Sequence, residues 1–476
     1  MSGSGGPRGS SPARPRRFWQ VGIAAILACG VLAGPASAAS FLRGFNEPLF
    51  MSADGAARDS IFDQSVRANA NLARLNFSWR RMTNGVPANP ASPSDPAYNF
   101  TDLDEAVREA ASRGLQVLIT VYEAPEFAEA PNQPSDANPG TWKPDPEALG
   151  QLAQAIASRY SGSFTPTLLG QPLPAVRYFE AWNEANISEY LTPQSKKGKL
   201  VGADHYREML NAFSAGVARS SNSGAKVVFA GSAPYGDPIG GRRTRPLRFL
   251  REVFCLNGKL KGTKCKDEAN FDILGHHPIT LSGGPNRSAI HPDDAAMPDF
   301  KNVIETLRAA ERENTIAGGK HAAWATEIWW ETKPPDPNAI PVNKHARWVA
   351  ESLFSLWKQD SGAVIWLQII DTPLDPDGSG AYQTGLLNAD GSEKRSFTAF
   401  RFPFVADRTS KSKVNVWTIA PASGTLEIQE KRRGEFRTID RMDVRDGKPD
   451  QKKIKLNGNA KLRGVIAGEA SLADSG

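Results

Sequence analysis

Eight short apolar segments alternate with amphipathic helical stretches along most of the chain, and this alternation constrains the fold more than any other feature. The expected strands, rich in Val, Ile and Phe, are residues 41–45, 72–77, 116–121, 176–182, 226–230, 271–274, 322–326 and 363–369. The stretches with helical periodicity are residues 57–70, 103–113, 146–160, 204–220, 246–254, 300–317 and 344–358. Eight strands separated by helices predict an α/β chain that closes into a (β/α)8 barrel rather than an open sheet.

The lengths of the loops support the barrel independently. Connections that follow strands are long and rich in Pro, Asn and Gly, namely residues 82–99, 124–143, 280–298, 331–342 and 371–393. Several connections that follow helices are short turns, namely residues 112–114, 317–320 and 361–362. Long loops on one side are typical of a barrel whose working face lies at the carboxyl ends of its strands.

The character of the sequence changes near residue 404. Short alternating segments follow, separated by turns such as Asp446-Gly447 and Asn457-Gly458. We therefore expect a barrel over residues 39–404 and a small, sandwich-like all-β domain over residues 405–476. This domain could bind a sugar or a surface, or only cap the barrel.

The first 38 residues are typical of a secretory signal peptide. They hold four Arg and no acidic residue, an apolar run over residues 21–34, and the small-residue pattern that ends at Ala38. The run is short for a membrane anchor, and no second apolar run of membrane length follows. The sequence predicts a secreted protein without a transmembrane segment. Export by the twin-arginine route, from Arg16-Arg17, and a lipid anchor on Cys29 remain open.

Cleavage after Ala38 would leave two cysteines, Cys255 and Cys265, with nine residues between them. An even pair in an oxidising compartment is expected to form a disulfide. No His lies between them, so the pair lacks the further ligands that a metal site needs.

Charge and motif content exclude several classes of function. The net charge of +6 comes from the two ends of the chain, so the central body is not a basic nucleic-acid surface. No phosphate loop, dinucleotide fingerprint or nucleophile elbow is present. We expect no metal and no cofactor, and the sequence carries no signal for the oligomeric state.

Two of the predicted strands run directly into a Glu that is flanked by Trp. Glu184 follows the fourth strand, and Glu327 follows the seventh. A carboxylate at the end of a buried strand destabilises the fold unless it is paired. Its presence there therefore indicates a structural or chemical role. An ordinary solvent-exposed position at the rim of the barrel would explain one such Glu, but it explains two on opposite sides of the barrel less easily. The pair predicts acid–base or nucleophilic chemistry at the carboxyl ends of the strands.

The residues around both carboxylates resemble a known group. Trp182-Asn183-Glu184-x-Asn186 is similar to the W-N-E-P-N signature of clan A glycoside hydrolases, although Ala185 stands where Pro is usual. Thr326-Glu327 before Trp329 resembles the nucleophile segment of that clan. The stretch after the eighth strand, which includes residues 366–368 and 382–387, resembles bacterial members near the cellulase and family 39 groups.

This resemblance implies a retaining glycosidase that cleaves a sugar substrate, expected to be β-linked. Glu184 would be the general acid/base, Glu327 the nucleophile, and Asn183 the residue that holds the 2-hydroxyl of the sugar. Physical reasoning agrees, because closely spaced carboxyls leave no room for a water and force a covalent intermediate. A carbohydrate-binding barrel with an inactive site and a transglycosylase with the same residues are the alternatives.

Other residues are candidates for supporting roles. Arg74 on the second strand is expected to keep Glu327 ionised, unless it points outward to solvent. His277 is favoured over His276 as the imidazole that faces the pocket, and a zinc site there is the weaker alternative. The candidate aromatic residues for sugar binding are Trp366, Trp182 and Tyr122.

Three further carboxylates lie near the expected working face. Asn46-Glu47-Pro48 repeats the N-E-P string, but it ends the first strand and lacks the preceding Trp, so we do not expect acid catalysis there. Glu123 and Glu331 are second-choice positions at the rim.

Overall fold

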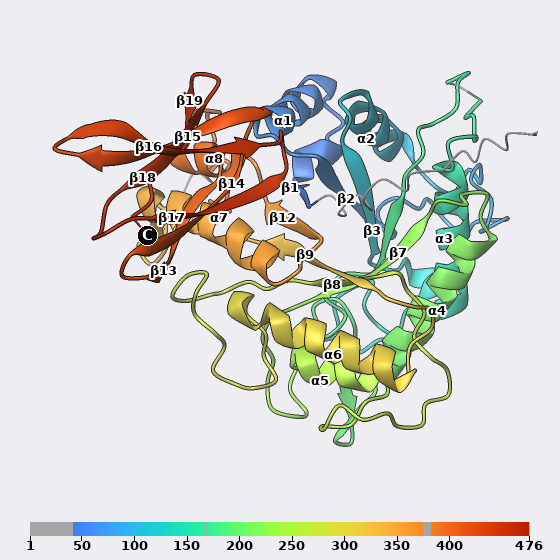
Figure 1. Cartoon of the computed structure of the whole chain (residues 1–476). Helices are drawn as coiled ribbons and strands as arrows, with labels where there is room; N and C mark the ends of the chain where they lie inside the picture. Colours follow the sequence, from blue (N-terminus) through green and yellow to red (C-terminus); the bar gives the residue numbers. More distant parts are fainter. Residues whose placement is uncertain (1–40, 168, 375–381, 476) are drawn as a thin grey trace, which may run out of the picture. The chain divides into compact units, whose positions relative to one another are not determined.

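The computed structural model describes residues 41–167, 169–374 and 382–475, and its central feature is a closed barrel of eight parallel strands (Figure 1). Around the barrel the strands follow the order β1, β12, β9, β8, β7, β4, β3 and β2. Their bounds are β1 Leu42–Asn46, β2 Leu72–Ser78, β3 Gln116–Tyr122, β4 Tyr178–Ala181, β7 Lys226–Ser232, β8 Ile273–His276, β9 Ala322–Ile328 and β12 Ala363–Leu367. Each strand overlaps one of the eight predicted segments, so the predicted barrel is confirmed. The predicted signal peptide lies outside the described residues.

The helices lie between successive strands (Figure 1). They are α1 Gly55–Arg67, α2 Thr101–Ser112, α3 Pro146–Arg159, α4 Gly202–Arg219, α5 Pro246–Val253, α6 Phe300–Glu313, α7 Val342–Lys358 and α8 Arg395–Arg401. The sequence pattern missed only α8, which is too short to show helical periodicity. Within the described residues, no helix has the length and apolar character needed to span a membrane.

Short elements decorate the loops that follow the strands. The 3-10 turns are η1 Pro48–Met51, η2 Glu126–Ala128 and η3 Met297–Asp299. The two-residue strands are β5 Ser195–Lys196, β6 Lys199–Leu200, β10 Thr332–Lys333 and β11 Ile340–Pro341. These loops lie at the carboxyl ends of the barrel strands, on the same face as Glu184 and Glu327.

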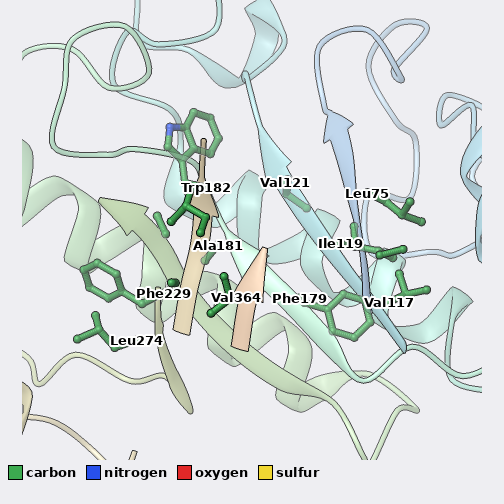
Figure 2. Close-up of a cluster of buried hydrophobic side chains, with 14 of the residues drawn as sticks. Leu75, Val117, Ile119, Val121, Phe179, Ala181, Trp182, Phe229, Leu274 and Val364 are labelled. Atoms are coloured by element: carbon green, nitrogen blue, oxygen red, sulfur yellow. The ribbon is translucent and has the colours of Figure 1, made fainter. Parts of the chain in front are cut away.

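The alternation of side chains along the strands builds two apolar layers. Facing inward, every strand contributes to one plug: Leu42, Leu72, Leu118, Tyr178, Val228, Ile273, Trp324, Ala363 and Ile365. Facing outward, side chains such as Phe179, Phe229 and Val364 pack in the layer between strands and helices (Figure 2). Two residues beyond the plug, the inward positions become polar. Arg74 follows Leu72, and Glu180 follows Tyr178. The apolar plug thus underlies a cluster of inward polar side chains, which we call the polar pocket.

The C-terminal segment forms two antiparallel sheets with a core of their own. One sheet has the order β13-β14-β17 and the other β16-β15-β18-β19. The strands are β13 Phe404–Ser410, β14 Lys413–Ile419, β15 Gly424–Arg432, β16 Glu435–Val444, β17 Pro449–Lys455, β18 Leu462–Ile466 and β19 Glu469–Ala470. Val416, Ile428, Ile454 and Leu462 pack in one cluster that both sheets share. This is the sandwich-like arrangement that the sequence predicts.

Cys255 and Cys265 form the predicted disulfide, with their Cα atoms 5.8 Å apart. Cys255 lies two residues after the end of α5, on the connection that leads back to β8. This connection runs to the amino end of β8, on the side away from Glu184 and Glu327. The disulfide therefore acts on stability and not on chemistry.

We predict that the double substitution Cys255→Ser/Cys265→Ser lowers the free energy of unfolding by about 2–3 kcal/mol, because a cross-link that closes a loop this short restricts the unfolded chain by that amount. Urea unfolding of oxidised protein and of the double variant measures the difference. Reduced wild-type protein is the control and should match the variant. An unchanged unfolding midpoint in the variant would contradict a stabilising role.

Candidate active site

A buried guanidinium lies at the centre of the polar pocket. Arg74 points inward from the middle of β2, and its side chain is 0 % exposed. Its Nη2 is 2.9 Å from Glu180 Oε2 and donates to Asn183 Oδ1 at 2.8 Å, while its Nη1 is 3.0 Å from Glu327 Oε2. Nε donates to Thr120 Oγ1 at 2.9 Å. One cation therefore joins β2, β3, β4 and β9.

Glu180 is a site residue that the sequence analysis did not select. It lies inside β4 and is fully buried. Besides Arg74, it accepts from Thr120 Oγ1 at 2.6 Å and from the backbone N–H of Gly231 at 3.1 Å. The sequence does carry a signal for Glu180, because it is the one charged residue within the otherwise apolar segment 178–182. Glu180 is the fully buried counter-ion of Arg74, because both side chains are 0 % exposed and lie 2.9 Å apart.

Glu327 is the last residue but one of β9 and is the second carboxylate that contacts Arg74. Its side chain is 16 % exposed, so it reaches the open part of the pocket. Asn46, at the end of β1, donates from Nδ2 to Glu327 Oε2 at 3.2 Å. Asn76 in turn donates to Asn46 Oδ1 at 2.9 Å, which fixes the orientation of the Asn46 amide. Two donors, one of them a cation, thus hold Oε2 of Glu327 in place.

Glu184 has different surroundings. Its Oε1 is 2.8 Å from Nδ1 of His277, and its side chain is 15 % exposed. Burial raises the pKa of Glu184 to about 7, although Arg74 acts in the opposite direction. Burial also lowers the pKa of His277 to about 4, so the imidazole is neutral near pH 7. Glu184 therefore holds its proton at a pH where an ordinary Glu has lost it.

The backbone around Glu184 is held in unusual conformations. Trp182 has φ 82° and Glu184 has φ 38°, both in the left-handed region that side chains other than glycine rarely adopt. Asn186 anchors the turn, because its side chain donates to the carbonyls of Ala233 and Thr244 and accepts from the N–H of Ala233. Such conformations persist only where the surroundings enforce them, and they gather at functional sites.

Gly231 on β7 makes room for this arrangement. Its N–H donates to Glu180, and its carbonyl accepts from the N–H of Glu184 at 3.0 Å. A Cβ at this position would overlap the imidazole of His277 and the hydroxyl of Thr326. Gly231 therefore lets the imidazole reach Glu184.

The aromatic candidates lie at different depths. Trp366 is fully buried, points outward and packs 5.9 Å from the ring of Trp330 and 5.4 Å from that of His345, so the expectation that it contacts a sugar is corrected. Ile365 takes the inward position instead, because neighbours on a strand face opposite sides. Trp182 is fully buried beyond the end of β4 (Figure 2) and donates to the carbonyl of Tyr190.

Tyr122 is half-buried, and its ring lies 6.3 Å from that of Tyr190. Tyr190 is a second residue that the sequence analysis missed. Burial raises its pKa, and Glu184 and Glu327 raise it further, so its hydroxyl lies within the field of both carboxylates. Nothing in the sequence singles it out, because it lies in a loop twelve positions after β4 begins.

The surroundings of the remaining candidates follow from their hydrogen bonds and their burial. His276 is buried between Ser232 and the carbonyl of Ala295. Glu47 accepts from three backbone N–H groups, those of Leu49, Ile369 and Ile370, and thereby ties η1 to the end of β12. Glu123 accepts from Ser78. Burial raises the pKa of Glu331, which lies at the rim. Within the described ranges, no group of three or more His, Cys, Asp or Glu is arranged to hold a metal ion.

Comparison with known proteins defines the fold but not the activity. No family model and no curated protein matches the chain. A solved family 39 glycoside hydrolase from the gut symbiont Bacteroides cellulosilyticus WH2 has a TM-score of 0.52 at 16% identity, over 87% of this chain and 80% of that one. At this identity the comparison shows a shared fold, and the solved enzyme belongs to the group that the Trp182–Asn186 motif resembles.

Two further solved structures are similar over most of their length. A glucosidase from Croceicoccus marinus gives a TM-score of 0.49 at 16% identity, over 88% of this chain and 92% of that one. A family 39 enzyme from Xanthomonas axonopodis pv. citri gives 0.48 at 13% identity, over 89% and 92%.

We predict that Arg74→Met lowers the free energy of unfolding by about 3–5 kcal/mol, because it leaves the buried charge of Glu180 unpaired. The double variant Arg74→Met/Glu180→Gln should be more stable than Arg74→Met alone, since it removes that charge. Urea unfolding of both single variants and the double variant gives the coupling energy. Strictly additive losses would contradict a buried ion pair.

Proposed function

We propose that the chain is a retaining glycoside hydrolase in which Glu184 is the general acid/base and Glu327 the nucleophile. The observation that carries the proposal is the contrast between the two carboxyls. Glu327 forms an ion pair with the guanidinium of Arg74 at 3.0 Å. Glu184 lies beside a neutral imidazole, and burial raises its pKa to about 7. Glycoside cleavage by a retaining enzyme requires two carboxyls with such different surroundings, one held by a cation and one that keeps its proton.

In the first step, the ionised Glu327 attacks the anomeric carbon of the bound sugar. Glu184 donates its proton to the glycosidic oxygen, the bond to the leaving group breaks, and a glycosyl ester forms on Glu327. The contacts of Arg74 and Asn46 to Oε2 fix the carboxylate, so that Oε1 is the free oxygen for attack. The pocket thus orients the nucleophile before the substrate binds.

In the second step, Glu184 is ionised and acts as a base. It takes a proton from a water, the hydroxide attacks the anomeric carbon, and Glu327 leaves as a carboxylate. His277 supports this state, because its Nε2 has no partner among the described residues and the proton is best placed on Nδ1. Nδ1–H then donates to the ionised Glu184.

Asn183 is placed for a contact with the sugar. Its Oδ1 accepts from Arg74 at 2.8 Å, so its Nδ2 is the group left to donate. We propose that it donates to the 2-hydroxyl, a contact that strengthens in the transition state. Tyr122 and Tyr190 are proposed to border the sugar. Together with the predicted signal peptide, these assignments describe a secreted enzyme that acts on β-linked glycosides.

We predict that Glu184→Gln and Glu327→Gln each lower kcat/KM by about 10²–10⁴-fold or more, because each removes a group that bonds to reacting atoms. Azide should restore turnover of an activated aryl β-glycoside to both alanine variants, giving the β-glycosyl azide with Glu184→Ala, by attack on the glycosyl enzyme, and the α-glycosyl azide with Glu327→Ala, by direct attack on the substrate. A panel of aryl β-glycosides measures both effects. Glu126→Gln, an exposed carboxyl on η2, is the matched control. Full activity of the Glu327 variant would contradict the assignment.

We predict that kcat/KM falls as the pH rises through about 7, because the proton of Glu184 is lost over this range. The sign follows from the raised pKa: the competent acid form is present below that value and absent above it. This alkaline limb of the pH profile should disappear in Glu184→Gln when the leaving group is 2,4-dinitrophenolate, which departs without a proton. A limb at the same pH in that variant would assign it to another group.

A further inference from the structure

A cavity of ≈ 350 Å³ lies beside the loop that carries Glu184, and none of the assignments above uses it. Its walls come from the loop after β7, over residues 237–245, from the start of α5, and from the hairpin β5–β6. His291 and Asp293, from the loop after β8, complete it. The volume lies within the range of small-molecule sites and suits a sugar unit.

This cavity and the turn after Glu184 are joined by the backbone. The N–H of Ser188 donates to the carbonyl of Arg242 at 2.8 Å, and the N–H of Thr244 donates to the carbonyl of Asn186 at 2.7 Å. Ile187 and Arg243 form an antiparallel bridge between these bonds. The arginine-bearing loop and the turn of Glu184 therefore form one rigid unit. Because a general acid protonates the leaving group, this unit borders the side on which the leaving group departs.

The cavity carries positive charge that the protein does not neutralise. Arg243 pairs with Asp237 at 2.7 Å, and the lining carboxylate Asp293 pairs with Arg251 at 2.8 Å. Arg245 pairs with Asp294 at 2.5 Å. Each of these acids is thus matched by an arginine.

Arg248 lines the same cavity and has neither an ion pair nor a hydrogen bond among the described residues. It lies on α5 and is only half-exposed, so its guanidinium is the surplus charge of the cavity.

Two other groups add features that a sugar could use. The N–H of Asp293 donates to Nδ1 of His291, so the neutral ring carries its proton on Nε2 as a donor. Ile239 is 57% exposed and gives the wall an apolar patch. Guanidinium, ring N–H and an aliphatic face together match a saccharide that bears an anionic group.

We propose that this cavity is a subsite for an anionic sugar unit, carboxylated or sulfated, on the leaving-group side of the cleaved bond. The proposal rests on the proposed glycosidase function and extends it to the class of substrate. Arg248 binds the anion, and Arg243 and Arg245, fixed by their own carboxylates, frame it. The substrate is then an acidic polysaccharide or oligosaccharide rather than a neutral one.

The test measures binding of defined probes to the full chain by isothermal titration calorimetry. Oligogalacturonate supplies carboxylates, sulfated dextran oligosaccharides supply sulfates, and cello-oligosaccharides supply neutral sugar. Arg248→Gln removes the surplus charge. Arg312→Gln removes the same charge from an exposed position in the last turn of α6, at the opposite end of the barrel, and is the matched control.

We expect one or both anionic probes to bind, and Arg248→Gln to weaken that binding about tenfold, the loss of one charge-assisted contact. Arg312→Gln should bind as the wild type does, and whichever probe responds identifies the anion. Equal binding by Arg248→Gln and the wild type, an equal loss in Arg312→Gln, or binding of neither anionic probe would each overturn the proposal. Binding needs no turnover, so a failed glycosidase assignment would appear separately, as activity that survives in Glu327→Gln.

Discussion

The site depends on one buried guanidinium. Arg74 has no solvent to compensate its charge, so the fold must supply carboxylates, and it supplies Glu180 from β4 and Glu327 from β9. Glu180 is the fully buried counter-ion of the cation, whereas Glu327 remains partly open to the pocket. The same ion pairs that hold strands of the barrel together therefore place a carboxylate where it can react.

Glu184 and Glu327 differ in the groups that they contact directly. Both lie in one pocket, yet only Glu327 contacts the cation directly, while the direct partner of Glu184 is a neutral imidazole. Burial then dominates at Glu184 and raises its pKa. The strained turn at Trp182 and Glu184 is held by Asn186, and backbone hydrogen bonds of Asn186 and Ser188 join it to the loop that lines the arginine-rich cavity.

The fold could be predicted from sequence, as could the position of Glu184 and Glu327 at the ends of strands, whereas most of the contacts around these two residues could not. Apolar segments that alternate with helices specify a barrel, and Glu184 and Glu327 stand out because each ends a strand beside Trp. Strands buried on both faces show no alternation, so sequence could not decide whether Trp366 points inward. Glu180 contacts Arg74 and Asn46 contacts Glu327 because of the register between strands, and Tyr190 comes close to both carboxylates because of the path of its loop. Neither the register nor the path of the loop can be inferred from sequence.

We propose that Glu327, held by Arg74, forms the covalent bond to the sugar. The most direct measurement is mass spectrometry of the chain after incubation with a panel of 2-deoxy-2-fluoro-β-glycosyl fluorides, which trap the glycosyl ester of a retaining enzyme. The account predicts one added glycosyl mass on the peptide that contains Glu327, and none in Glu327→Gln. A label on Glu184 or Glu180, or equal labelling of the wild type and the variant, would contradict it.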